Sequence, residues 1–313
     1  MPRPASIIPP SLRSACTHPL SVFLLGCILT TFGIFVLRAE LRRNDALRFD
    51  RHTERILVAI SNRLAEYDRI ARAGLGLFAA SQHVDRHKWK TFVESLHLDN
   101  LPGMIGFGFL ERIPSDQLPS YVQRMRSGGA TMFELHLLPG NSVVAPNDDR
   151  LVISYLEPQQ TNAAAIGLDL SGNTEIRKTA QRAVKEDRPI ITPKLTTLNG
   201  QPSQASAILL APVYSDYAPG QLENHRSAIL KGWVYLPLVF ERVLGDVAAS
   251  KVAEVDFQVF DGNSTNQEAL LFDSLSKRPR VANASAAPAL STIRSFDFAG
   301  RSWAIHIAAR PEF

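Results

Sequence analysis

The sequence predicts an α+β protein with one N-terminal transmembrane helix, a long stalk helix and two units built on antiparallel sheet. Three observations carry this prediction. Residues 19–37 contain no charged side chain, residues 38–81 contain no proline and repeat apolar residues at intervals of three and four, and the strand-like segments beyond them do not alternate regularly with helices. The last pattern is typical of an α+β fold with antiparallel sheet.

The charge-free run from Pro19 to Leu37 is long enough to cross a membrane. At about 1.5 Å per residue, such a helix spans roughly 28 Å, close to a hydrocarbon core of about 30 Å. Two alternatives stay open. A cleaved signal peptide usually has a shorter apolar run, and a lipoprotein signal ending at Cys27 would not be followed by so many uncharged residues. Arginines flank both ends of the run, so charge alone leaves the orientation open.

Residues 38–82 are predicted to continue the transmembrane helix as a stalk. Apolar residues follow a three-four spacing on one face, and charged residues fill the other. The apolar stripe has two interpretations, which can hold at different heights: it packs on the protein's own body, or it forms part of a dimer seam. Its main positions are Phe49, Ile56, Ile60, Tyr67, Ile70 and Leu77.

Three further helices are predicted. The first runs from about Arg86 to Leu96 with Asp85 as its N-cap. A short second helix is capped by Ser115 and ends near Gly128. The third runs from Thr174 to Glu186 and has a charged outer face.

Strand-like segments lie between and after these helices. A second, smaller unit is expected from about Ala253, with an exposed loop over residues 276–291 and a hairpin around Gly300. At about 60 residues this unit must lean on the larger one for stability. Strands are expected at residues 104–112, 133–138, 151–156, 191–198, 206–214, 229–238, 255–262, 270–274, 293–297 and 303–308.

Composition excludes several classes of protein. The net charge is +4, of which Arg3 and Arg13 contribute two charges before the end of the apolar run. The remaining surplus is too small for a nucleic-acid footprint, so no nucleic-acid partner is expected. The two cysteines, Cys16 and Cys27, both lie in the N-terminal segment, which excludes a disulfide framework or a thiolate zinc site in the body.

The sequence contains no motif of a known catalytic chemistry. It has no P-loop, no dinucleotide-binding glycine pattern, no nucleophile elbow and no H-E-x-x-H run. His83 and His87 are four residues apart, but a metal site would need more ligands, so we interpret them as polar surface. We therefore expect no catalytic residue, no metal site, no cofactor and no enzymatic activity.

Asp169 is the residue that best suits a binding site. It follows a strand-like A-A-I-G-L run and precedes Ser171 and a helix. Its carboxylate can cap this turn, or it can lie at the edge of a pocket and accept hydrogen bonds from a ligand. Thr192 can line the cavity or serve packing, and Tyr155 can be a core aromatic or stack on a ligand. Glu157 is expected on the surface.

A series of short motifs follows in order along residues 50–250. It comprises G-L-G-L-F-A-A-S at 74–81, the helix at 89–96, L-P-G-M-I-G-F-G-F at 101–109, Y-L-E-P at 155–158, Asn162, G-L-D-L-S at 167–171, Arg177, Ala180, Ala183, Thr192 with Pro193, and P-V-Y at 212–214. No single motif is specific, but the ordered series resembles the CHASE domain. One departure is Asp-Arg-Pro at 187–189, where the family usually has a glycine-containing turn, so the resemblance does not predict the shape of that turn.

The resemblance implies an extracytoplasmic sensor with two PAS-like units above a dimeric stalk. It implies that the body lies in the periplasm and that the stalk helix forms a homodimer. Family members normally carry a second transmembrane helix, whereas the one apolar run of this sequence predicts a single-pass protein of the bacterial inner membrane. The implied divisions are residues 1–18 as cytoplasmic N-terminus, 19–37 as transmembrane helix, 38–82 as stalk, 83–250 as membrane-distal ligand-binding unit and 251–313 as membrane-proximal unit.

The resemblance also implies a small-molecule ligand. In plant receptors of this family the ligands are cytokinins, which are adenine derivatives, so an adenine-like ligand is one hypothesis. Asp169 matches the aspartate that bonds the adenine there, and Ile191 falls at an apolar pocket position. With Thr192, Tyr155 and Leu209 they form the candidate ligand-binding set.

The sequence is compatible with three functions. The favoured one is a membrane-anchored sensory domain that binds a small organic ligand and signals through its stalk. The second is a structural module that assembles with another membrane signalling protein and has no ligand. The third is an anchored hydrolase, which would need a nucleophile and base in contact. Because family members usually carry a cytoplasmic kinase or cyclic-dinucleotide module, any output activity is expected beyond Phe313 or on a partner chain.

Overall fold

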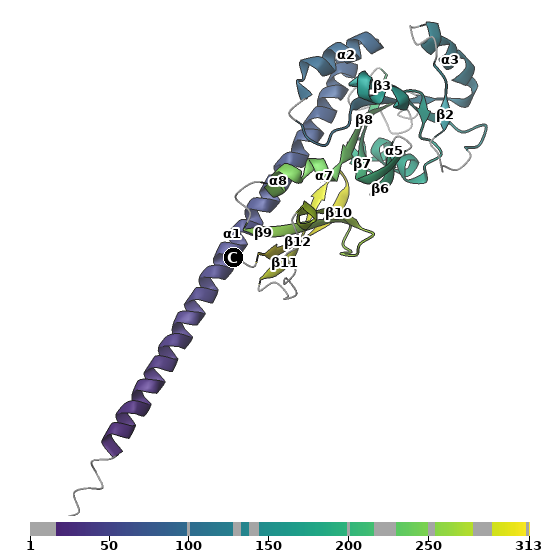
Figure 1. Ribbon diagram of the computed structural model, residues 1–313. Helices are drawn as coiled ribbons and strands as arrows, with labels where there is room; N and C mark the ends of the chain where they lie inside the picture. The colour runs from purple at the N-terminus through teal and green to yellow at the C-terminus, as the bar shows by residue number, and fades with distance from the viewer. Residues whose placement is uncertain are drawn as a thin grey trace, which may run out of the picture. The chain divides into compact units, whose positions relative to one another are not determined.

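The computed structural model describes residues 17–98, 101–127, 133–137, 144–198, 201–215, 230–249, 254–277, 290–310 and 313. The chain divides into two compact parts, Met1–Arg51 and His52–Phe313. The first part contains the apolar segment, and the second contains both sheets (Figure 1). The expectation for Gly128 and for most of the loop at 276–291 lies outside the described residues.

A single helix, α1, runs from Thr17 to Ala80. The predicted transmembrane and stalk segments are therefore continuous, and the helix ends two residues before the expected boundary. Among the described residues, α1 is the one helix long and apolar enough to cross a membrane by length and composition, with a mean hydropathy of 2.1 over an 18-residue window. The hydroxyls of Thr30 and Thr31 donate to carbonyl oxygens one turn earlier, so neither needs water as a partner.

In the part His52–Phe313, one face of α1 is buried. The ring of Phe78 packs against Trp89 and Phe109, with centroid distances of 5.8 and 4.7 Å. In this part the apolar stripe thus packs on the protein's own body, which was the first of the two interpretations of the stripe. The dimer seam stays a prediction. The buried positions of this face include Thr53, Ile56, Ile60, Leu64, Tyr67, Ala71 and Phe78.

The larger sheet has eight strands in the order β2-β4-β3-β1-β8-β7-β5, and β6 pairs with β7. All pairs are antiparallel except β2 with β4. The strand predicted at 191–198 is two short strands, because the chain leaves the ladder between Ile191 and Leu195. The strands are β1 (Phe107–Ile113), β2 (His136–Leu137), β3 (Arg150–Glu157), β4 (Leu168–Asp169), β5 (Ile190–Ile191), β6 (Leu195–Leu198), β7 (Gln201–Tyr214) and β8 (Leu230–Val239).

Helices cover both faces of this sheet. On one face, α5 (Thr174–Glu186) packs through Ile176, Ala180 and Ala183 into an apolar cluster with side chains of β1, β3, β7 and β8. On the other face lie α1, α2 (Arg86–Ser95) and α3 (Leu118–Ser127). Along β3, Leu151 and Ile153 belong to the α5 cluster and Val152 to the other core, as the period of two requires. A bulge opposite Phe109 and Leu110 then shifts this alternation.

The smaller sheet has four antiparallel strands in the order β10-β9-β12-β11. Its hairpin turns at Ala299 and Gly300, which have φ of +44° and +80°, as a two-residue turn between twisted strands requires. The prediction of α+β architecture with two antiparallel-sheet units is confirmed. The strands are β9 (Val255–Asp261), β10 (Leu270–Asp273), β11 (Ser291–Phe298) and β12 (Arg301–Ala309).

Short helical turns complete the fold. They are η3 (Ser115–Gln117), α4 (Gln159–Asn162), η4 (Ala163–Ala165), α7 (Phe240–Val243), α8 (Gly245–Ala249) and η5 (Ser274–Lys277).

The helix ends show which local predictions hold. Asp85 caps α2 by accepting from the Lys88 N–H, as predicted. The prediction that Ser115 is an N-cap is wrong, because Pro114 occupies that position and no side chain caps the turn. Asp187 takes the left-handed C-cap of α5 with φ of +50°, a conformation in which glycine is more usual.

The expectation of a surface position for Glu157 is also wrong. The residue is 7% exposed, and its Oε2 accepts a hydrogen bond of 2.9 Å from the Gln159 N–H. A buried carboxylate needs such a donor, and the sequence alone did not indicate one.

Candidate functional site

Asp169 ends β4, and its carboxylate points into the turn that follows. Its Oδ1 accepts hydrogen bonds from the N–H and the hydroxyl of Ser171 at 2.9 and 2.5 Å and lies 3.4 Å from the Leu151 nitrogen. Its Oδ2 lies 3.4 Å from Nη1 of Arg150. The residue is 4% exposed. These contacts fit the turn-capping alternative, while the N-cap of α5 itself is Asn173.

Ile191, Thr192 and Leu209 meet at the opposite edge of the sheet. Ile191 pairs with Leu209 across β5 and β7, and Thr192 exchanges two hydrogen bonds with the backbone of Ile208. All three side chains are buried. The path from β4 to β5 crosses five strand spacings, roughly 24 Å at about 4.8 Å each. The structure therefore does not bring Asp169 together with this group.

Tyr155 lies on β3, and its side chain contacts the segment between α1 and α2. Its ring stacks on Phe109, and its hydroxyl donates to the Val84 carbonyl oxygen at 3.3 Å. Burial raises the pKa of this hydroxyl to about 12. Tyr155 is thus a half-buried aromatic side chain whose polar end already has a partner.

A partly buried polar network, missed by the sequence analysis, lies beside Tyr155. The Glu111 carboxylate accepts hydrogen bonds from the Ser154 hydroxyl at 2.7 Å and from Arg124 at 2.9 Å. Since Ser154 donates to Glu111, the Tyr121 hydroxyl donates to Ser154 at 2.8 Å. Burial raises the pKa of Glu111. Every member has a partner, so this network serves structure.

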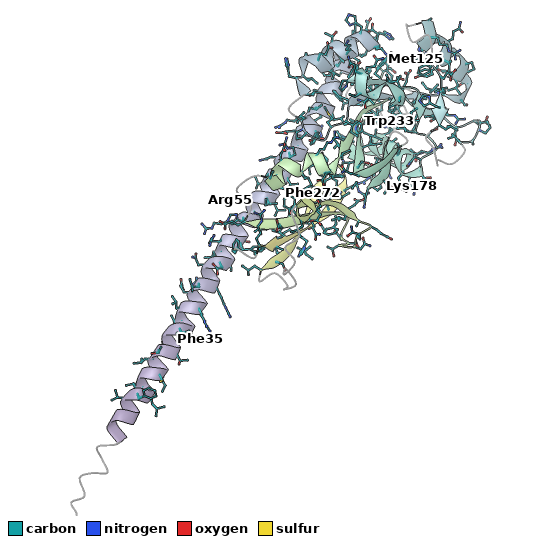
Figure 2. The ribbon with its side chains drawn as sticks, in the orientation of Figure 1. Phe35, Arg55, Met125, Lys178, Trp233 and Phe272 are labelled. Carbon is teal, nitrogen blue, oxygen red and sulfur yellow. The ribbon has the colours of Figure 1, made fainter. Side chains whose placement is uncertain are left out.

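The α5 hollow is a depression of about 590 Å³ between α5 and the ends of β1, β3 and β8. Its floor includes Trp233, which is 3% exposed and donates its indole N–H to the Ala180 carbonyl oxygen at 3.0 Å. Figure 2 labels Trp233 on β8 and Lys178 on α5. None of the five candidate residues lines this hollow. It is lined by Arg112, Asp148, Asp149, Leu151, Arg177, Ala180, Gln181, Val184, Lys185, Leu230 and Trp233.

Two arginines hold the acidic turn at one end of the α5 hollow. Arg112 of β1 donates to Asp149 at 2.6 Å, and Arg177 of α5 donates to Asp148 at 2.8 Å. The two aspartates precede β3, so this turn is fixed from the sheet on one side and from the helix on the other. Such charge-assisted bonds fix geometry. Lys185 lies on the same helix at the other end of the hollow.

Asp169 is connected to the α5 hollow through Ser171. The Ser171 carbonyl oxygen accepts two hydrogen bonds from Arg177, from Nε at 2.9 Å and from Nη2 at 2.7 Å. Because Asp169 holds Ser171 and Ser171 holds Arg177, the buried carboxylate orients a residue of the hollow without reaching it.

The far end of α5 contacts the smaller sheet. Arg182 donates to the Gly300 carbonyl oxygen at 2.7 Å, and the Ile191 N–H donates to the Ala299 carbonyl oxygen at 3.0 Å. A third link joins the Lys194 N–H to Asp261 at 2.8 Å. The helix that forms a wall of the hollow is thus bonded to the β11–β12 hairpin.

Sequence reasoning did not single out Arg112, Asp148, Asp149 or Lys185. The one available signal was the pair of adjacent acids in N-D-D-R before a strand. Arg177 entered only as part of the family resemblance. Within the described part of the chain, no three His, Cys, Asp or Glu side chains are grouped so that they could hold a metal ion.

Comparisons with known proteins complete the description. A protein-family model described as CHASE domain matches residues 82–272. The ligand-binding domain of the Pseudomonas aeruginosa PAO1 amino acid chemoreceptor PCTC, solved in complex with GABA, is 10% identical with a TM-score of 0.39, over 84% of this chain and 99% of its own. A methyl-accepting chemotaxis protein X is 14% identical with a TM-score of 0.43, over 85% of this chain and 99% of its own. A search of curated proteins found no significant match.

Proposed function

The chain belongs to the CHASE domain family, and from this premise we propose that it is a membrane-anchored sensor that binds a small organic ligand outside the cytoplasm. Residues 19–37 anchor it in a bacterial inner membrane, residues 38–82 form the stalk, and the body lies in the periplasm. Residues 83–250 form the ligand-binding unit and residues 251–313 the unit nearer the membrane. The candidate transmembrane helix supports the anchor.

The α5 hollow is the observation that carries the ligand-binding part of the proposal. Its volume of about 590 Å³ lies within the range of roughly 300–1,000 Å³ that small-molecule sites occupy. Its lining combines apolar side chains, among them Leu151, Ala180 and Trp233, with four charged side chains that are held in two ion pairs. Apolar surface and a set of fixed polar groups occur together in small-molecule sites.

The bonds at the end of α5 support a route for signal transmission. A ligand can shift an equilibrium only by binding one arrangement more tightly. A ligand that contacts Lys185 or Gln181 would bias the position of α5. Through Arg182 and Gly300 this bias would reach the smaller sheet, and from there a dimer of stalks.

Asp169, Ile191, Thr192, Tyr155 and Leu209 stay hypotheses as ligand contacts. Their buried side chains and existing partners support a different role for most of them, which is to hold the walls of the unit. For Asp169 the supporting contact is its double bond to Ser171, which in turn holds Arg177.

A structural module without ligand is the second candidate function. It is favoured by the filled surroundings of Asp169, Ile191 and Leu209, which are 4%, 1% and 0% exposed. A closed interior at these positions is what an assembly module would have. An adenine-like ligand at Asp169 would need that side chain to leave its present partners.

Two experiments test the proposal. Alkaline phosphatase fused after Phe313 should be active in bacteria, and a fusion before Met1 should not be; the reverse would contradict the orientation.

A thermal-shift screen of the full chain in nanodiscs against purines, amino acids and small carboxylates should give at least one stabilising ligand. If no compound in any class raises the melting temperature, the structural module is the better account.

A further inference from the structure

We propose that the α5 hollow takes a small organic anion, a carboxylate with an apolar body, whose charge pairs with Lys185. This inference rests on the proposed function and adds the chemical class of the ligand. It is carried by three properties of the hollow: its charge, its length and the nature of its floor.

The charged side chains of the α5 hollow do not cancel. Arg112 and Arg177 are each bonded to an aspartate, so those four charges are compensated within the protein. Lys185 is exposed, and among the described residues its ammonium has no hydrogen-bond or ion-pair partner. The lining therefore carries one uncompensated positive charge, at the end of the hollow where Lys185 lies.

The charge of the other exposed lysine of α5, Lys178, is compensated within the protein. Lys178 lies on the same helix outside the hollow, and its ammonium is 3.2 Å from the Glu175 carboxylate. The two lysines thus lie on the same helix, but Lys178 is paired with a carboxylate outside the hollow and Lys185 lines the hollow. Of the two lysines, only Lys185 lines the hollow.

The length of the hollow sets the size of the ligand. Arg177 and Lys185 are eight residues apart on α5, which is roughly 12 Å at about 1.5 Å per residue. Between them the wall is formed by Ala180 and Val184, and Trp233 lies beneath. A ligand of this length would place its carboxylate at Lys185 and its apolar body over the floor of the hollow.

The acidic residues argue against a cationic ligand. Asp148 and Asp149 each already accept from an arginine, so an ammonium group would meet two compensated carboxylates and one uncompensated lysine. A neutral ligand could accept a hydrogen bond from Lys185 but would leave its charge uncompensated, and hydrogen bonds between two charged groups are the stronger ones.

Three probes of one shape test the class of ligand. They are 3-phenylpropionate, 3-phenylpropionamide and 3-phenylpropylammonium, titrated by calorimetry into the full chain in nanodiscs. We expect the anion to bind at least about tenfold more tightly than the amide and the ammonium to bind most weakly. The anion should also lose affinity when the salt concentration is raised from about 50 to about 500 mM, because screening of charges increases strongly over this range.

Matched variants test the position of the charge. Lys185→Gln should weaken binding of 3-phenylpropionate about tenfold, whereas Lys178→Gln should leave it unchanged. Equal effects of the two variants, or tighter binding of the amide than of the anion, would overturn the inference. If the amide or the ammonium binds best, the chain is still a sensor but of another ligand class. If no probe and no compound of the wider screen binds, both the inference and the proposed function fail.

Discussion

Arg182 on α5 donates a hydrogen bond of 2.7 Å from Nη1 to the carbonyl oxygen of Gly300, 118 positions further along the chain. This bond joins the helix of the larger sheet to the hairpin tip of the smaller one. Both ends are at fixed elements, because Gly300 lies in a two-residue turn and Arg182 lies within α5. The packing around it gives the first prediction.

Gly300→Ala should destabilise the protein more than the strain of an alanine at positive φ alone would. Gly300 has φ of +80°, and an added Cβ would lie 2.7 Å from Cδ1 of Ile190. We expect a loss of about 1–3 kcal/mol in the free energy of unfolding from strain and overlap together. Gly262→Ala is the matched control, since its φ is +81° and nothing lies within 4 Å. Denaturant unfolding followed by tryptophan fluorescence compares them, and equal losses would mean that the hairpin does not pack as described.

Arg177→Lys should cost stability although it keeps the charge. The guanidinium donates twice to Ser171 and once to Asp148, and a single ammonium cannot reproduce that fork. We expect a loss of about 1–2 kcal/mol in the free energy of unfolding. Lys178→Arg, at an exposed pair on the same helix, should change it by less than about 0.5 kcal/mol. A neutral result for Arg177→Lys would show that the turn before β3 is not held by this side chain.

Asp169→Asn separates a structural role from ligand contact. The amide keeps the shape of the carboxylate but is a weaker acceptor for the Ser171 N–H and hydroxyl. We expect the free energy of unfolding to fall by about 1–3 kcal/mol in the absence of any ligand. Should the variant be as stable as the wild type and yet lose its response in the thermal-shift screen, Asp169 would be a ligand contact and the structural account of it would be wrong.

Glu111 should make stability fall as pH rises. Burial raises its pKa in the folded state, so the folded protein holds the proton in a range where the unfolded chain, with a glutamate pKa of about 4.3, has released it. Its contribution is therefore largest below the unfolded value and is lost as pH increases through the folded value. The charged and titratable groups around Glu111 are Arg124, His83, Tyr121 and Tyr155.

Glu111→Gln should remove this component of the pH dependence. This component is measured by comparing the denaturant midpoints of the wild type and the variant from about pH 4 upwards, where the unfolded glutamate titrates. We expect the difference between the two proteins to change in favour of the variant as pH increases. A difference that is constant with pH, or that changes in favour of the wild type, would contradict a raised pKa.

Elements with strong local signals were predictable from the sequence. The helix from Thr174 to Glu186 has the predicted ends because Asn173 caps it and its apolar residues lie on one face. The β11–β12 hairpin was predictable because Ala299 and Gly300 form a tight turn between two alternating segments. Both depend on residues near one another in the chain.

The α5 hollow was not predictable because its parts meet only in the folded state. Arg112 comes from β1, Asp149 from the turn before β3 and Arg177 from α5, and each of them reads as an ordinary surface charge in the sequence. Asp169 was a natural candidate as a lone acid after a strand. Its orientation toward Ser171 depends on the Leu151 backbone and Arg150, which only the pairing of β3 with β4 brings near it.

The most direct test of a ligand in the α5 hollow is to fill it. Gln181 is exposed and lines the hollow, while Lys178 is exposed on the same helix outside it. Calorimetric titration of the full chain with the most stabilising compound of the screen should show at least about tenfold weaker binding for Gln181→Trp and a wild-type Kd for Lys178→Trp. Unchanged affinity in Gln181→Trp would contradict the account, because a ligand that ignores an indole ring placed in the hollow does not bind there.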